Sequence, residues 1–241
     1  MDPITRTAPD LPGKIILSQS WRELVFIHWR IDAAEVAPFL PAGIIPDEFD
    51  GSSWIGLIPF GMHDSAAFGG PAVPYFGSFT EVNVRLYGVD RQGRRGVVFL
   101  SLEASRLAAV LTARALFTLP YFWARASLTR ADGQLRYRST RISAAAPATL
   151  IVARPSSVRV TDNALAEFLT ARWTLFETRA GRTIAMFNEH DPWELFEAEL
   201  VELRDELIAA SGIGSVGLRA PDSVLYSPGV ITRFSAPQTL A

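Results

Sequence analysis

The stretch Phe79-Thr-Glu-Val-Asn-Val-Arg-Leu-Tyr87 alternates polar and apolar residues with a period of two, which is typical of a β-strand. The alternation places Glu81, Asn83 and Arg85 on one face, and Val82 with its aliphatic neighbours on the other. If the aliphatic face packs into the core, the polar face points either to solvent or into the lumen of a barrel, where its charges need partners. From alternation alone, the solvent-facing strand is the favoured interpretation.

A second strand is predicted at residues 21–31, with Leu24, Phe26, His28 and Arg30 on one face. Taken alone, His28 is typical of a partly buried, hydrogen-bonded histidine, and Arg30 of a surface charge at the end of a strand. Two separate strands, however, each end their apolar pattern in polar groups of opposite sign. This arrangement favours a small pocket in the mouth of a barrel.

Turn signals and helical patterns define the rest of the fold class. Helices are predicted after Asp32, whose spacing to Glu35 resembles a capping box, and over residues 105–118 and 163–170. Residues 193–210 carry several glutamates, and their central part fits either a strand or a helix. Turn signals stand between strand-like runs, as in hairpins, at Asp50-Gly51, Arg91-Gln92-Gly93, Asp132-Gly133 and Ala180-Gly181. We predict an α+β protein built on a mostly antiparallel β-barrel or cone-shaped sheet with a few surrounding helices.

Composition bounds the domain organisation and the classes of partner. The chain has 241 residues, of which 49% are hydrophobic, and this is enough apolar material for one sizeable core. We expect a loose N-terminal arm at residues 1–13, a single domain at 14–234 and a tail at 235–241. The net charge of −2 argues against a nucleic-acid or anionic-membrane partner. The lack of a signal pattern or a long apolar stretch leads us to expect a cytoplasmic protein.

The sequence lacks the motifs of metal and cofactor sites. It contains 0 cysteines, and its three histidines, His28, His63 and His190, are far apart with no metal-site spacing. No Walker loop, Rossmann fingerprint or Gly-x-Ser-x-Gly elbow occurs. We therefore expect neither a metal nor a cofactor.

Several segments, taken in order, resemble the YqjF-like family of uncharacterised bacterial proteins. They are His28-Trp29, Ile58-Pro-Phe-Gly-Met62, Phe79-Thr-Glu-Val-Asn-Val-Arg85, Gly96-Val-Val-Phe-Leu-Ser-Leu-Glu103, Ala113-Arg-Ala-Leu-Phe-Thr-Leu-Pro-Tyr121, Phe168-Leu-Thr-Ala-Arg-Trp173 and His190-Asp-Pro-Trp193. That family is placed in the acetoacetate decarboxylase-like superfamily. The resemblance implies a closed or cone-shaped antiparallel barrel with helices around it and a pocket inside, which agrees with the pattern above.

Three positions can be compared with the motifs of the true decarboxylases. His28-Trp-Arg-Ile-Asp32 resembles the motif that carries an arginine after the first strand, and it supplies Arg30. Phe79-Thr-Glu81 resembles the glutamate motif of a later strand. Leu119-Pro120-Tyr121 resembles the segment that carries the lysine, but here a tyrosine stands in its place. Because the decarboxylases form a Schiff base through that lysine, and the only lysine here is Lys14 near the N-terminal arm, we do not expect this chemistry.

What remains of the resemblance implies an internal pocket for a small carbonyl or carboxylate compound. Arg30 would hold a carboxylate or other oxyanion, Glu81 would orient it or act as a base, and the Tyr121 hydroxyl would donate to a carbonyl oxygen. A lyase or isomerase that works by proton transfer is the first hypothesis. The further candidates for ligand binding are His28, Arg85, Arg114 and His190.

Other interpretations of the same residues stay open. The pocket could bind a ligand without turnover, as a sensory or binding barrel does. Arg30 and Glu81 could instead form a structural ion pair. The acidic run of residues 194–206 could bind a protein partner, although an ordinary solvated face is favoured. The sequence does not decide whether the protein is an enzyme or whether it forms a homo-oligomer.

Overall fold

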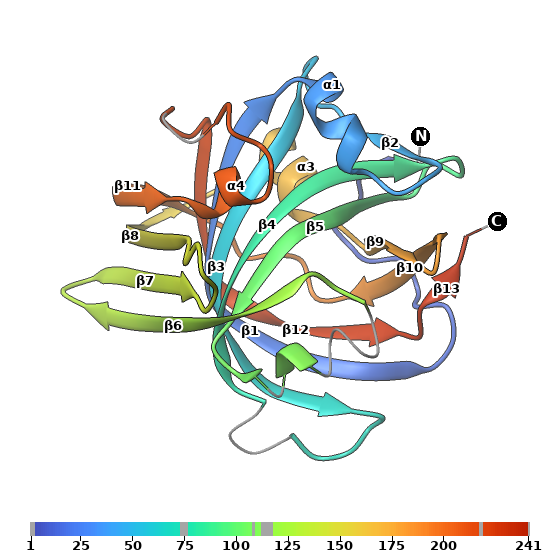
Figure 1. The fold of residues 1–241 in the computed structure, drawn as a ribbon, viewed down its shortest axis with the longest axis horizontal. Coiled ribbons are helices and arrows are strands. Elements are labelled where there is room, and N and C mark those ends of the chain that lie inside the picture. Colours follow the sequence, from blue (N-terminus) through green and yellow to red (C-terminus); the bar gives the residue numbers. More distant parts are fainter. Residues whose placement is uncertain (1–2, 73–76, 108, 112–117, 217–218, 241) are drawn as a thin grey trace.

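A computed structural model describes residues 3–72, 77–107, 109–111, 118–216 and 219–240. The strands are β1 (Ile15–Ile31), β2 (Ile44–Pro46), β3 (Ser53–Ala67), β4 (Phe79–Asp90), β5 (Arg95–Ala104), β6 (Tyr121–Ala131), β7 (Gln134–Arg141), β8 (Ala148–Arg159), β9 (Thr174–Arg179), β10 (Arg182–Glu189), β11 (Phe196–Asp205), β12 (Ser223–Ser235) and β13 (Gln238–Thr239). The short helices are α1 (Ala33–Val36), the 3₁₀ helix η1 (Ala37–Phe39), α3 (Ala164–Thr170) and α4 (Leu207–Ala210). This strand-rich α+β architecture confirms the predicted fold class (Figure 1).

All these strands belong to one sheet that closes on itself. Neighbour by neighbour, the pairing runs from β12 through β1, β3, β4, β5, β9 and β10 and returns to β12. A second branch leaves β5 through β6, β7, β8 and β11 and also returns to β12. Figure 1 shows the β6–β7 hairpin on one side of the central strands and β9, β10 and β13 on the other. The pairs are antiparallel except for β5 with β6 and β5 with β9, which meet at the strand where the two branches divide.

The central strands are buried on both faces. The odd-numbered residues of β1 from Val25 to Ile31 join a core that includes Val82 and Val84 of β4 and residues of β7 and β8. Leu24 and Phe26 face the other way, toward the interior of the ring. The predicted two-sided pattern of residues 21–31 is therefore correct, and the sheet separates a filled core from a hollow interior.

Local sequence signals set the predicted turns and helix starts. Asp132 and Gly133 have φ angles of 51° and 72°, and this pair of positive angles makes the tight turn between β6 and β7. Asp32 caps α1 by accepting a hydrogen bond from the Ala34 amide at 2.8 Å. Asn163 caps α3 in the same way, through the Ala166 amide at 2.9 Å.

Two of the sequence predictions have other outcomes. The central part of residues 193–210, which fitted either element, forms strand β11, because its neighbours β8 and β12 offer hydrogen-bonding edges. The predicted helix at 105–118 lies partly outside the described residues, and of the rest, positions 107 and 109–111 are helical.

The terminal segments contact the body of the domain. The Trp173 indole donates a hydrogen bond to the Thr5 carbonyl at 3.0 Å, and Arg6 forms an ion pair with Glu167 at 3.1 Å. Strand β13 pairs with β10 near the C-terminus. Strand β1 lies beside β12, with Ile15 opposite Ser235 and His28 opposite Ser223.

Candidate functional site

A cavity of about 430 Å³ lies inside the closed ring of strands. Strands β1, β3, β4, β5, β9 and β10 supply most of its wall, and the wall is mainly apolar. The apolar contacts include Trp21, Phe26, Phe60, Met62, Phe79 and Phe99. The polar side chains that line it among the described residues are Gln19, Ser65, Glu81, Asn83, Arg85, Tyr121, Thr170, Arg172, Asn188 and His190. An apolar pocket with a few converging polar groups is the usual form of a small-molecule site.

Glu81 lies at the wall of this cavity rather than in solvent. Its exposed fraction is 2%, and that of Asn83, two residues along β4, is 4%. The solvent-facing interpretation of this strand is therefore wrong. The polar face points into the lumen because the Val82 face packs into the core on the other side of the sheet.

Tyr121 is brought to Glu81 by the parallel pairing of β5 and β6. Pro120 accepts a hydrogen bond from the Leu102 amide at 3.0 Å, and β6 then begins at Tyr121 beside Leu102. Because β4 is the next strand along, the Tyr121 hydroxyl reaches across and donates a hydrogen bond to Glu81 Oε2 at 2.8 Å. The two residues predicted as catalytic thus form a direct contact inside the cavity.

The protonation of this pair is set by burial. Burial raises the pKa of Glu81 to about 7, although hydrogen bonds from Tyr121 and Asn83 oppose the rise. Burial and the neighbouring Glu81 carboxylate raise the pKa of Tyr121 well above its usual range, so the phenol keeps its proton. Within the described part of the chain, Glu81 has no ion-pair partner. A glutamate that exchanges protons near neutral pH therefore faces a mainly apolar space.

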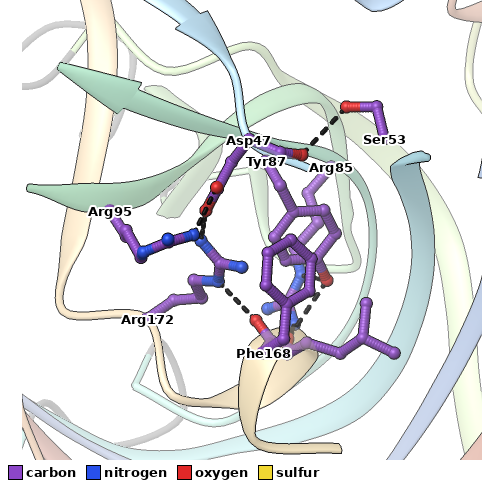
Figure 2. Close-up of polar contacts among 8 residues, drawn as sticks. Asp47, Ser53, Arg85, Tyr87, Arg95, Phe168 and Arg172 are labelled. Carbon is purple, nitrogen blue, oxygen red and sulfur yellow. Dashed lines mark hydrogen bonds and ion pairs between the residues drawn. The ribbon is translucent and has the colours of Figure 1, made fainter. Parts of the chain in front are cut away.

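Two arginines, Arg85 of β4 and Arg172 of the segment after α3, also line the cavity. Arg85 donates through Nε to the Tyr87 hydroxyl at 3.0 Å and through Nη2 to the Leu169 carbonyl at 3.1 Å. Arg172, in the segment after α3, donates through Nε to the Phe168 carbonyl at 2.6 Å and through Nη1 to Asp47. Figure 2 shows Arg172 and Arg95 both pointing at the buried Asp47 carboxylate.

His28 of β1 contacts the Tyr87 hydroxyl, to which Arg85 also bonds. It is fully buried, and its Nε2 lies 2.6 Å from the Tyr87 hydroxyl. The hydroxyl also accepts from Arg85 and donates to Leu169, so the hydroxyl is satisfied when His28 Nε2 carries the proton and donates, while His28 Nδ1 has no hydrogen-bond partner among the described residues. Burial and the nearby Arg85 and Arg172 hold the pKa of His28 well below its usual range. His28 is thus a neutral, hydrogen-bonded histidine that is fully rather than partly buried, and it is not among the described residues that line the cavity, where it was expected to bind ligand.

His190 lies at another part of the cavity wall, in an aromatic cluster. Its ring centroid is 4.6 Å from those of both Trp173 and Trp193. Burial lowers the pKa of His190 to about 4, so the ring is neutral at physiological pH. Nδ1 donates to the Asp191 carbonyl at 2.7 Å, which leaves Nε2 as an acceptor.

Arg30 lies away from the candidate site. Its guanidinium contacts Asp50 Oδ2 at 3.3 Å and lies 4.9 Å from the centroid of the Trp54 ring, beside a separate surface hollow. The described residues that line the cavity do not include it, and its ion-pair partner is Asp50 rather than Glu81. Arg30 and Glu81 therefore do not form one polar end, contrary to the expectation from the sequence. Arg114 lies outside the described residues.

Arg172 and Asn188 are site residues for which the sequence predicted no role. Arg172 belongs to the segment Phe168-Leu-Thr-Ala-Arg-Trp173, which carries part of the family resemblance. It lies in irregular backbone between α3 and β9, where no repeating pattern in the sequence predicts the direction of a side chain. No cluster of three or more acidic or histidine side chains in the described chain could hold a metal ion. Among the same residues, no helix is long and apolar enough to cross a membrane.

Comparison with known proteins adds the family and the fold. A family model described as an uncharacterized conserved protein, DUF2071, matches residues 18–231. The uncharacterized protein YqjF of Bacillus subtilis (strain 168) is 32% identical over 195 residues, which cover 80% of this chain and 79% of the relative.

Several solved structures share the fold at low sequence identity. Acetoacetate decarboxylase from Legionella pneumophila has a TM-score of 0.68 at 14% identity, covering 97% of this chain and 92% of that one. The enduracididine biosynthesis enzyme MppR complexed with pyruvate has a TM-score of 0.64 at 16% identity, covering 96% and 92%. An acetoacetate decarboxylase-like enzyme from Sphingomonas wittichii RW1 has a TM-score of 0.66 at 14% identity, covering 94% and 93%. The match to the family model over most of the chain, together with the identity to YqjF, shows that this protein belongs to the YqjF family of uncharacterised conserved proteins and has the acetoacetate decarboxylase-like fold.

Proposed function

We propose that this protein binds a small, partly apolar carbonyl compound in its cavity and moves a proton on it with Glu81 and Tyr121. The observation that carries the proposal is the buried Glu81 carboxyl, whose pKa of about 7 suits a general base at neutral pH. Its hydrogen-bond partners are the neutral groups Tyr121 and Asn83, and within the described ranges of the chain no cation pairs with it.

The hydrogen bond between the two residues suggests how the proton is handled. Ionised Glu81 takes a proton from the carbon next to the carbonyl, and the electron pair of that C–H bond moves to the carbonyl oxygen as an enolate. The new Glu81 hydroxyl can then donate to the Tyr121 oxygen. This reversal frees the tyrosine proton to donate to the enolate oxygen. Return of the Glu81 proton to another position of the delocalised anion gives an isomerisation, whereas exchange of the Glu81 proton with solvent water before its return gives isotopic exchange.

Schiff-base decarboxylation is not part of the proposal. Lys14, which is the only lysine of the sequence, is exposed just before β1 and is not among the residues that line the cavity. Tyr121 lies where the decarboxylase motif carries its lysine, and a phenol cannot form the imine that withdraws electrons in that reaction.

Binding without turnover is the second candidate, because the wall of the cavity is mainly apolar. The two functions are separated by hydrogen–deuterium exchange. A ketone probe, 2-octanone, is incubated in deuterated buffer with the wild type, Glu81→Gln or Glu197→Gln, and loss of the proton signals next to the carbonyl is followed by NMR. Glu197 is an exposed residue of β11 and serves as the matched control.

We expect exchange above the buffer rate in the wild type and in Glu197→Gln, and exchange at the buffer rate in Glu81→Gln. Ligand binding without exchange in any of the proteins would support the binding function and overturn the catalytic one. Equal exchange in the wild type and Glu81→Gln would show that Glu81 is not the base.

A further inference from the structure

We propose that the Arg85–Arg172 end of the cavity is a carboxylate subsite. The substrate would then be an oxo acid whose carboxylate is separated from its carbonyl by a chain of several carbons and is retained through the reaction. The part of this inference that concerns the carbonyl rests on the proposed function of Glu81.

The first observation is a hydrogen-bond donor without a partner. The exposed fraction of Arg172 is 5%, and its Nη2 has no hydrogen-bond acceptor, while Nε and Nη1 bond to Phe168 and Asp47. A buried cationic donor that is left unsatisfied is costly, and native structures rarely keep one without a reason. Arg172 lines the cavity, but Nη2 itself is enclosed in the wall, so a ligand acceptor reaches it only after a shift of the guanidinium.

The second observation is the charge at this end of the cavity. Asp47 is shared between Arg172 and Arg95, so Arg172 does not have a carboxylate of its own. Arg85 pairs with no carboxylate among the described residues, and its donors go to the neutral oxygens of Tyr87 and Leu169. The guanidinium groups of Arg85 and Arg172 both lie over the Tyr87 ring, so the two positive charges are close together. A ligand anion would supply the negative charge that this end of the cavity lacks.

The two guanidinium groups are held in place before any ligand arrives. The Arg85 and Arg172 guanidinium carbons lie 5.4 Å and 4.8 Å from the centroid of the Tyr87 ring (Figure 2). Arg172 also lies 4.1 Å from the centroid of the Phe168 ring. Aromatic contacts of this kind, together with the backbone acceptors, restrict the side chains and lower the entropy that binding would cost.

The third observation is the spacing between this subsite and Glu81. Arg85 and Glu81 are four residues apart on β4, which corresponds to about 13 Å along the strand. The Arg85 guanidinium bonds to Tyr87, two residues farther along, and so leans away from Glu81. A carboxylate held there would be too far from the base to be the neighbouring group of a short β-oxo acid. It would instead anchor one end of a longer molecule that runs along the apolar wall.

Binding of an acid and its neutral amide tests the subsite without reference to catalysis. Octanoate and octanamide are titrated calorimetrically into the wild type, Arg85→Met, Arg172→Met and Arg30→Ala, with folding checked by circular dichroism and thermal melting. We expect the wild type and the Arg30→Ala control to bind octanoate at least tenfold more tightly than octanamide, and we expect the preference to fall below twofold in Arg85→Met and Arg172→Met. Arg85→Met leaves the Asp47–Arg172 pair intact and keeps the test valid if Arg172→Met does not fold.

Equal affinity for the two wild-type ligands, or an unchanged preference in the folded arginine variants, would overturn the subsite. The spacing is tested by exchange at the carbon next to the carbonyl of 7-oxooctanoate and 4-oxopentanoate, with a kcat/KM at least tenfold higher expected for the longer acid. Equal or faster exchange of the shorter acid would refute the remote position of the carboxylate. Glu81→Gln should keep the octanoate preference, so a failure of the proposed catalysis and a failure of the subsite give different results.

Discussion

The pH dependence of folding stability gives a direct test of the environment assigned to Glu81. Its pKa is about 7 in the folded protein, against an ordinary value of 4.5. Because the folded pKa is the higher one, the folded state binds the proton more tightly than the unfolded state does. The stabilisation from protonated Glu81 is fully present below about pH 4.5 and is lost as the pH rises through about 7.

The size of the effect follows from the shift. One pKa unit corresponds to about 1.4 kcal/mol, so moving from 4.5 to about 7 amounts to about 3 kcal/mol of unfolding free energy. Glu81→Gln replaces the titrating carboxyl with a neutral group of similar shape. The unfolding free energy of the wild type minus that of the variant should therefore fall by about 3 kcal/mol between about pH 4.5 and pH 8.

Urea denaturation of both proteins across this pH range measures the difference. The difference between two proteins is needed because burial also raises the pKa of Glu177 to about 7, and this adds a slope of the same sign to each. Glu197→Gln, which changes an exposed residue of β11 and leaves Glu81 in place, is the control and should keep the pH dependence of the wild type. A wild-type-minus-Glu81→Gln difference that stays constant from pH 5 to pH 8 would refute the assignment of a buried, unpaired carboxyl to this position.

Three further outcomes are expected. Tyr121→Phe removes a hydrogen bond that favours the ionised form of Glu81, so the pKa of Glu81 should rise by about one unit. The pH midpoint of proton exchange should rise with it, and an unchanged midpoint would contradict the contact between Tyr121 and Glu81. Arg30→Ala should leave ligand affinity within about twofold of the wild type. Because the Arg30 ion pair is half-exposed, the variant should lower the free energy of unfolding by less than about 1 kcal/mol in thermal or urea denaturation. A loss of binding would show that Arg30 contacts the ligand. Gly229→Ala should destabilise the fold by about 3 kcal/mol or more, since φ is +135° and a Cβ would lie 2.0 Å from the Trp21 carbonyl oxygen. If urea denaturation gave a decrease in unfolding free energy below about 1 kcal/mol, β1 and β12 would have to be able to separate at this point.

The elements that could be predicted from sequence are those set by local chemistry. The alternation of residues 21–31, the Asp132-Gly133 turn and the helix at 163–170 each depend on neighbours a few positions away, and each is present in the structure. Residues 193–210 were ambiguous because β11 is a strand only by virtue of its pairing with β8 and β12, which a single sequence does not display.

The candidate site was only partly predictable, for a geometric reason. Alternation shows that Glu81 and Arg85 share a face, but a face toward solvent and a face toward a lumen have the same period, and only closure of the sheet decides between them. Arg30 follows the pattern of Leu24 and Phe26 on β1, yet the strand continues past the end of the cavity. Residues that share a face of a long strand therefore need not share a site.

The pairing of the first long strand with the last one has a consequence for synthesis on the ribosome. Ile15 needs Ser235 as its partner, so β1 leaves the ribosome long before β12 exists, and at about 5–20 residues per second this delay is roughly 10 to 40 seconds. During that interval, β1 can pair with β3, and β3 with β4, in an open, curved sheet whose inner face still lacks its closing strands. The cavity can therefore form only after nearly the whole chain has been made, and nascent chains are the form of this protein in which aggregation is to be looked for first.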